Sequence, residues 1–282
     1  MDLGILTTTF PHATPEETFA AVARCGFRAV QFDFTNAGLT TLPDEIPPAL
    51  VERVRRAAEE HAVTIAAVSG TYNMIHPDPQ ERGIGLRRLG VLAGACVSLG
   101  RPIVTLCTGS RDPDDMWRHH PDNESPAAWD DLIQATRAAL AITDPAGLTL
   151  AFEPEPGNVL RTARQGRKLI ETIGSPRLGA VLDPANLFDR FAPGDEGRLP
   201  AILAEAVSLF GDRIVLAHGK DRAANGTVRP AGSGIVPWDR FFGLLRSVGY
   251  DGALIVHGLN ETDLDDAFAH LRAAGGPALR GR

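Results

Sequence analysis

LTLAFEPEPGN (residues 148–158) places two glutamates directly after a short apolar run, and similar runs elsewhere in the chain make this stretch the key to the fold. A short apolar run bounded by turn residues is typical of a buried strand. Side chains alternate along a strand, so Ala151 and Glu153 share one face and Phe152 lies on the other. If Phe152 packs against helices, Glu153 closes the strand on its inner face, and Glu155 follows with the same parity.

Eight strand-like runs recur along the chain, with strand starts about 25 to 45 residues apart. Amphipathic helical patterns separate them, and this alternation is typical of repeated βαβ units with a parallel sheet. Eight units in 282 residues predict an α/β fold, a single (β/α)8 TIM barrel over residues 1–282 without a linker. The alternative, a doubly wound open sheet, lacks a G-x-G-x-x-G turn after the first run. The runs are 3–9, 27–33, 63–69, 102–108, 148–153, 178–183, 213–218 and 253–257.

Two of the helical segments carry explicit start signals. Thr14 to Glu17 reads as a capping box, with Pro15 at the first helical position. Ser125 followed by Pro126 repeats the same kind of signal before a later helix. Further helical patterns occupy the other intervals between the strand-like runs.

Composition narrows the class of function. A formal charge of -7 disfavours a long nucleic-acid track, so we expect a small-molecule ligand and no nucleic acid. The chain has neither a run of about 18 apolar residues nor a signal-like N-terminus, which predicts a cytoplasmic protein without membrane contact. The three cysteines lie in apolar surroundings without C-x-x-C spacing and read as small core residues.

The last four strand-like runs end in polar side chains: Glu153, Asp183, His218 and His257. In a parallel barrel the carboxyl ends of all strands meet at one mouth, where active sites are found. Two carboxylates and two imidazoles that converge there form a ligand set for a divalent cation. We expect Mn²⁺ first, with Co²⁺, Mg²⁺ or Zn²⁺ as alternatives. For each residue alone, a solvated strand end or a hydrogen-bonded structural histidine is the competing interpretation.

The motifs AFEPEPGN, VLDPANLF, LAHGKD and AGSGIVPWDRFFGLLRSVGYDGALIVHGL together resemble the sugar phosphate isomerase/epimerase family of xylose isomerase-like TIM barrels. This family includes ketose 3-epimerases and inosose dehydratase. In ketose epimerases a Glu, Asp, His and Glu hold the metal, and the two glutamates also act as acid and base. The resemblance therefore implies metal ligands at Glu153, Asp183 and His218, with Glu153 also catalytic. Family members often form dimers or tetramers, so it also implies a homo-oligomer.

The chain departs from the family pattern at two positions. His257 stands where ketose epimerases have the second glutamate, so one of their two bases is missing. Asn186 stands where a histidine is usual. Lys220 shares a face with His218 and is one of only two lysines among 28 basic residues, which makes it the candidate replacement base through a lowered pKa. The alternatives are a Lys220–Asp221 surface pair, or a base at Glu155 or Glu261.

Two long loops in the first half are candidates for covering a sugar. Asn73 and His76 follow the third run, and Trp117 lies in the loop after the fourth. Together with Asn186 and Glu155 they are the predicted substrate-binding residues, with loop packing as the competing interpretation. Gly232 to Gly234, ahead of Trp238, predicts either a pocket wall or a tight turn before a helix.

These features predict a divalent-metal-dependent isomerase or epimerase that acts on a small sugar, keto-sugar or polyol through an enediolate. Glu153 and Lys220 are the predicted proton carriers. One alternative is a metal-dependent lyase or dehydratase that acts on a keto-sugar or keto-glycoside, because both reactions begin with the same proton abstraction. An alternative from another class is a non-catalytic or partner-dependent sugar-binding barrel.

Overall fold

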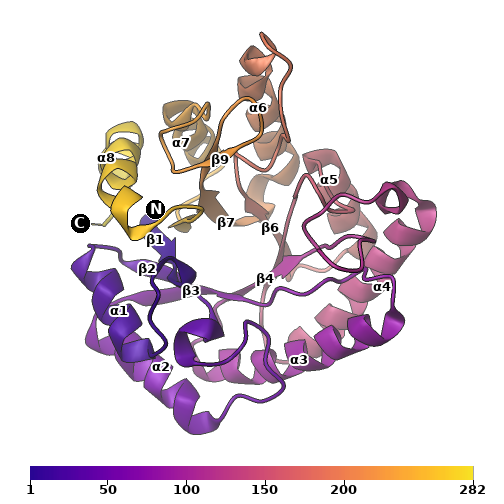
Figure 1. Cartoon of the computed structure of the whole chain (residues 1–282), viewed down its shortest axis with the longest axis vertical. Helices are drawn as coiled ribbons and strands as arrows, with labels where there is room; N and C mark the ends of the chain where they lie inside the picture. The colour runs from indigo at the N-terminus through magenta and orange to yellow at the C-terminus, as the bar shows by residue number, and fades with distance from the viewer. Residues whose placement is uncertain (282) are drawn as a thin grey trace.

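Eight parallel strands close into a barrel in the computed structural model, which describes residues 1–281 (Figure 1). Each of the eight predicted runs overlaps a barrel strand, so the (β/α)8 prediction is confirmed. Neighbours in the chain are neighbours in the barrel, and β1 closes the ring by pairing with β10. The barrel strands are β1 Asp2–Leu6, β2 Ala29–Phe32, β3 Thr64–Ser69, β4 Ile103–Cys107, β5 Leu150–Glu153, β6 Leu178–Leu182, β7 Ile214–Gly219 and β10 Ala253–Val256.

Eight helices surround the barrel in chain order (Figure 1). The two sequence signals for helix starts are confirmed: Thr14 caps α1 by accepting the N–H of Glu17, and Ser125 caps α4 by accepting the N–H of Ala128. None of the helices within residues 1–281 has the length and apolar character needed to cross a bilayer. The helices are α1 Pro15–Arg24, α2 Pro48–Glu60, α3 Pro79–Ser98, α4 Pro126–Thr143, α5 Ala163–Ile173, α6 Leu199–Phe210, α7 Trp238–Ser247 and α8 Leu264–Gly275.

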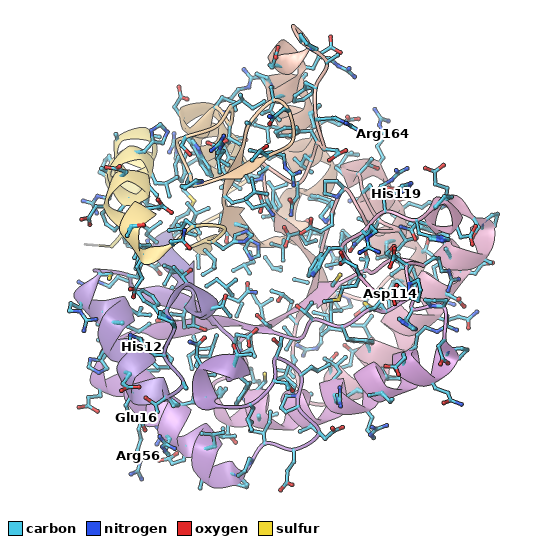
Figure 2. All side chains as sticks on the ribbon, viewed as in Figure 1. His12, Glu16, Arg56, Asp114, His119 and Arg164 are labelled. Atoms are coloured by element: carbon cyan, nitrogen blue, oxygen red, sulfur yellow. The ribbon has the colours of Figure 1, made fainter. Side chains whose placement is uncertain are left out.

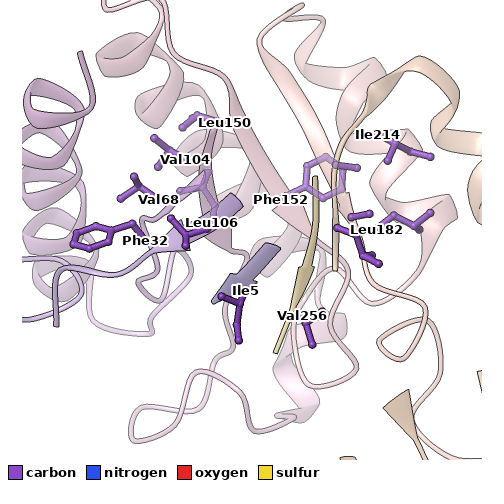
Figure 3. Close-up of a cluster of buried hydrophobic side chains, with 14 of the residues drawn as sticks. Ile5, Phe32, Val68, Val104, Leu106, Leu150, Phe152, Leu182, Ile214 and Val256 are labelled. Carbon is purple, nitrogen blue, oxygen red and sulfur yellow. The ribbon is translucent and has the colours of Figure 1, made fainter. Parts of the chain in front are cut away.

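Alternation along the strands divides the apolar side chains into two clusters. The inner cluster fills the barrel and includes Ala151, Val181 and Leu216. The outer cluster packs between strands and helices and includes Phe152 (Figure 3). The ring of Phe152 meets that of Phe210 in α6 edge to face, with centroids 6.0 Å apart. Burying one such side chain stabilises the fold by about 1.5–3 kcal/mol. Because Phe152 faces outward as predicted, Glu153 faces the mouth of the barrel.

A short antiparallel hairpin, formed by β8 (Asp221–Arg222) and β9 (Val228–Arg229), follows β7 and was not predicted. Asp221 is fully buried and fixes the turn beyond the hairpin. Its carboxylate accepts hydrogen bonds from the backbone N–H of Gly232 (3.0 Å) and Val236 (3.0 Å) and from Nε1 of Trp238 (3.0 Å). The glycine-rich segment is therefore a tight turn held by Asp221.

We predict that Asp221→Ala lowers the free energy of unfolding by about 2–4 kcal/mol, because it leaves several buried donors without an acceptor. Chemical denaturation measures this change. Asp239→Ala is the control, since Asp239 is exposed in the first turn of α7 and its loss costs at most about 1 kcal/mol. Equal stability losses in the two variants would contradict the role assigned to Asp221.

Candidate active site

A cavity of about 720 Å³ opens at the carboxyl ends of the barrel strands. This is the end where the sequence predicted the site, and the volume is that of a small-molecule pocket. Polar and titratable side chains from many strands and loops line it. The lining includes Gln31, Asp33, Ser69, Thr105, Cys107, Trp117, His119, Glu153, Glu155, Asp189, His218, Lys220, Arg222 and His257.

Three of the four predicted metal ligands come together here. One possible ligand atom from each of Asp183, His218 and His257 lies within 4.8 Å of the others. Nε2 of His257 is 3.0 Å from Oδ2 of Asp183, and the two imidazole rings meet edge to face with centroids 4.7 Å apart. Glu153 lies beside this cluster, with Oε2 3.2 Å from Nδ1 of His218.

Asp183 is the most deeply buried charge of the group, with an exposed fraction of 1%. Burial by itself raises the pKa of Asp183. Two neighbours outweigh burial: the ammonium of Lys220, whose Nζ lies 3.3 Å from Oδ2, and His257. The pKa of Asp183 therefore lies well below its usual range. Its other oxygen accepts the N–H of Ala185 at 2.8 Å. Burial, followed by the charge of Lys220, lowers the pKa of His257, which favours the neutral imidazole that a metal binds.

Glu153 is held by two neighbours. Nδ2 of Asn186 donates a hydrogen bond to Oε1 at 2.6 Å, and His218 lies against Oε2. Burial raises the pKa of Glu153, but attraction to the protonated form of His218 outweighs it and the net shift is downward. Asn186, predicted to bind substrate, is buried and also accepts a hydrogen bond from Nη2 of Arg222 at 3.3 Å. In this structure Asn186 therefore positions the Glu153 carboxylate.

Gln31 is a buried site residue that the sequence analysis missed. Its Oε1 lies 2.9 Å from Nε2 of His218, and its amide Nε2 donates to the hydroxyls of Ser69 (3.1 Å) and Thr105 (3.2 Å). The available signal was a glutamine inside the otherwise apolar run AVQF, at the same parity as the inward-facing Ala29.

Lys220 points into the site, but its pKa moves in the direction opposite to the expected one. Burial lowers the pKa of the amine, whereas attraction to Asp183, Glu155 and Glu153 raises it, and the net shift is upward. The lysine is thus held as a cation. Its partner is Asp183 rather than Asp221, because Asp221 is committed to the turn.

Glu155 lines the cavity, and its carboxylate makes no hydrogen bond or ion pair with any residue among 1–281. Burial, followed by repulsion from Glu153, raises its pKa to about 8. Glu261, the other loop candidate, is exposed in a 3₁₀ helix (Glu261–Asp263) and does not line the cavity. Among the loop carboxylates considered, Glu155 is the one available to a ligand.

The predicted substrate residues of the first half divide into two groups. Trp117 lines the cavity and is 49% exposed. Asn73 and His76 do not line it, because loop backbone occupies them: Nδ2 of Asn73 donates to the carbonyl of Ser110 (2.8 Å), and Nε2 of His76 lies 3.1 Å from the carbonyl of Pro113. Figure 2 labels Asp114 and His119 on the long loop between β4 and α4, the loop that also carries Trp117.

Asn158 anchors this loop to the segment after β5. Its Oδ1 accepts the N–H of Gly109 at 3.0 Å, and its Nδ2 donates to the carbonyl of Met116 at 2.8 Å. Gly157 beside it packs so closely that an added Cβ would lie 1.9 Å from the carbonyl oxygen of Trp117. The position of Trp117 over the cavity thus depends on the absence of a side chain at residue 157.

With this geometry established, comparison with known proteins assigns the family. Residues 19–274 match the xylose isomerase-like TIM barrel family, and the chain belongs to it. This agrees with the resemblance identified in the motifs.

Solved structures of similar fold include two sugar epimerases and a protein that binds zinc. One is D-psicose 3-epimerase from Clostridium cellulolyticum H10, solved with D-tagatose (16% identity, 98% of this chain and 99% of that chain covered, TM-score 0.74). Another is 3-keto-D-glucoside 4-epimerase from E. coli (18%, 97% and 99%, TM-score 0.75). A third is the IolI protein with a bound zinc atom (14%, 99% and 98%, TM-score 0.73). At these identities the similarity establishes the shared fold.

We predict that Gly157→Ala displaces the Trp117 segment and lowers the melting temperature, because the new methyl group meets backbone that cannot rotate away. Hydrogen exchange should rise in residues 115–119. Gly83→Ala is the matched control, since nothing lies within 4 Å of an added Cβ in that helical position and alanine should stabilise α3 by about 0.5–1 kcal/mol. Unchanged exchange in residues 115–119 of Gly157→Ala would contradict the close contact.

Proposed function

We propose that this chain is a divalent-metal-dependent isomerase or epimerase that acts on a small keto-sugar through an enediolate. The observation that carries the proposal is the meeting of the Asp183, His218 and His257 cluster with Glu153, Glu155 and Lys220 at one cavity. Membership of a family that includes sugar isomerases, and the activities of the enzymes with the same fold, support the sugar as substrate.

The ligand set fits a divalent cation. Two ligand atoms that each lie about 2.1 Å from one ion at right angles are about 3.0 Å apart. The Asp183–His257 and His218–Glu153 separations of 3.0 Å and 3.2 Å match this spacing. Nδ1 of His218 is a buried nitrogen without a hydrogen-bond partner within residues 1–281, as expected for an atom whose natural partner is a metal.

We infer that Asp183, His218, His257 and Glu153 hold the ion, with Mn²⁺ as the first candidate and Zn²⁺ the ion bound by the IolI relative. The mixed oxygen and nitrogen set suits several divalent ions. When bound, such an ion polarises the substrate carbonyl and acidifies the neighbouring C–H.

The remaining chemistry falls to the chain's own side chains. Glu155, whose carboxylate has no partner within residues 1–281, takes the proton from the carbon beside the carbonyl. Lys220, held as a cation, donates hydrogen bonds to the oxygen on which negative charge develops. Glu153, oriented by Asn186, is the second proton carrier and compensates for the histidine at position 257. Return of a proton to the opposite face of the same carbon gives epimerisation, and return to the neighbouring carbon gives isomerisation.

Solvent deuterium exchange tests this function directly. Protein loaded with Mn²⁺ and incubated in D₂O with a panel of ketoses should incorporate deuterium beside the carbonyl of at least one of them. Exchange with loss of a β-substituent would identify the lyase alternative. Sugar binding without exchange, by a protein that retains no metal during purification, would identify the non-catalytic alternative and contradict the proposal.

We predict that Glu155→Gln slows deuterium exchange by about 10²- to 10⁴-fold, because the amide cannot accept the proton. Metal content, measured by elemental analysis, should stay unchanged, since Glu155 is not among the proposed ligands. Glu261→Gln is the matched control and should exchange at the wild-type rate. Equal rates in the two variants would remove Glu155 from the mechanism.

We predict that Glu153→Gln abolishes turnover and weakens Mn²⁺ binding while the melting temperature changes little, because Glu153 lies at the mouth and not in the apolar core. Deuterium exchange, calorimetric titration and circular dichroism measure these three properties in turn. Full activity in this variant would exclude Glu153 from both the metal site and proton transfer.

A further inference from the structure

We propose that Gln31 fixes the tautomer of His218, so that Nδ1 of His218 is the atom that faces and binds the cation. The role is positioning rather than catalytic, because Gln31 acts on the reaction through His218. The inference rests on the proposed metal site for its consequence, but the tautomer itself is a property of the metal-free protein.

Gln31 belongs to a buried polar cluster beside the charged site. Gln31, Ser69 and Thr105 come from β2, β3 and β4, and each is about 5% exposed. The two hydroxyls receive the amide N–H groups of Gln31 at 3.1 Å and 3.2 Å. Oε1 is thereby turned across the barrel toward β7, where it meets Nε2 of His218 at 2.9 Å.

A carbonyl oxygen only accepts hydrogen bonds, so with the Gln31 amide in this orientation the neutral imidazole of His218 carries its proton on Nε2. The opposite tautomer would place the proton on Nδ1, which is buried and has no hydrogen bond of good geometry within residues 1–281, even though Glu153 is 3.2 Å away. A buried donor left without a partner costs about 1–3 kcal/mol. The bond to Gln31 and the vacant hydrogen-bonding position at Nδ1 therefore point to the same tautomer.

In the neutral imidazole, Nδ1 is therefore unprotonated and faces a carboxylate oxygen of Glu153. Two electron-rich atoms 3.2 Å apart in a buried site repel each other unless a cation lies against both. Because Gln31 holds the proton on Nε2, the lone pairs of His218 Nδ1 and Glu153 Oε2 both remain available to an ion. Groups that orient a metal-binding histidine in this way typically account for 10- to 100-fold in metal affinity.

Three variants test the inference. Gln31→Leu removes the acceptor at similar volume, and Gln31→Glu restores an acceptor at the same place. Thr136→Val is the control for loss of a buried polar group, since the buried Thr136 hydroxyl donates to the carbonyl of Leu132 in its own helix at 2.8 Å.

Nitrogen-15 NMR of the metal-free wild-type protein at alkaline pH reads the tautomer of His218, with a His218→Gln variant to assign the signal. We expect the proton on Nε2. Calorimetric titration with Mn²⁺ should then give an affinity 10- to 100-fold weaker for Gln31→Leu, within about threefold of wild type for Gln31→Glu, and unchanged for Thr136→Val.

A proton on Nδ1 in the wild-type protein would overturn the inference, even if Gln31→Leu failed to fold. Wild-type affinity in a folded Gln31→Leu variant would overturn it as well. If the wild-type protein bound no Mn²⁺ but showed the Nε2 proton, the proposed function would fail while the assignment of the tautomer stood, so the two failures are distinguishable.

Discussion

The site depends on one electrostatic constraint, the burial of the Asp183 carboxylate. A lone buried carboxylate would be protonated or would unfold its surroundings, so its charge requires partners. The partners are Lys220, directly after β7, His257, directly after β10, and the N–H of Ala185 in the segment after β6. Removing one partner of such a buried pair typically costs about 3–5 kcal/mol. The contacts that stabilise the buried Asp183 carboxylate therefore also hold the carboxyl ends of β6, β7 and β10 close together.

Above this constraint the barrel interior is arranged in layers that strand alternation imposes. Residues such as Ala151 and Leu216 fill the bottom with apolar side chains. Two positions further along come the polar groups of the site: Gln31 and Ser69 on one side of the barrel, and Glu153, Asp183, His218 and His257 on the other. Each step of two residues moves a side chain up one layer without changing its face. A rigid apolar base thus fixes the geometry of a polar site.

The sequence predicted the barrel well because periodicity and capping are local. The eight apolar runs, the outward Phe152 and the caps at Thr14 and Ser125 all depend on neighbours within a few residues. The β8–β9 hairpin and the role of Asp221 depend on contacts across up to 17 positions, which no local pattern reveals. The direction of the Lys220 pKa shift required knowing that three carboxylates lie nearby. Asn73 and His76 were predicted to contact the substrate, but they bond backbone carbonyls of another loop, which no local sequence pattern reveals.

The central claim is that strand ends brought together by a buried carboxylate converge on one cation. Anomalous diffraction from a crystal soaked in Mn²⁺ tests it most directly. The account predicts one strong peak about 2.0–2.3 Å from Asp183, from Nδ1 of His218 and from His257. A soaked crystal with no peak between these residues, or with its only peaks elsewhere on the protein, would contradict it.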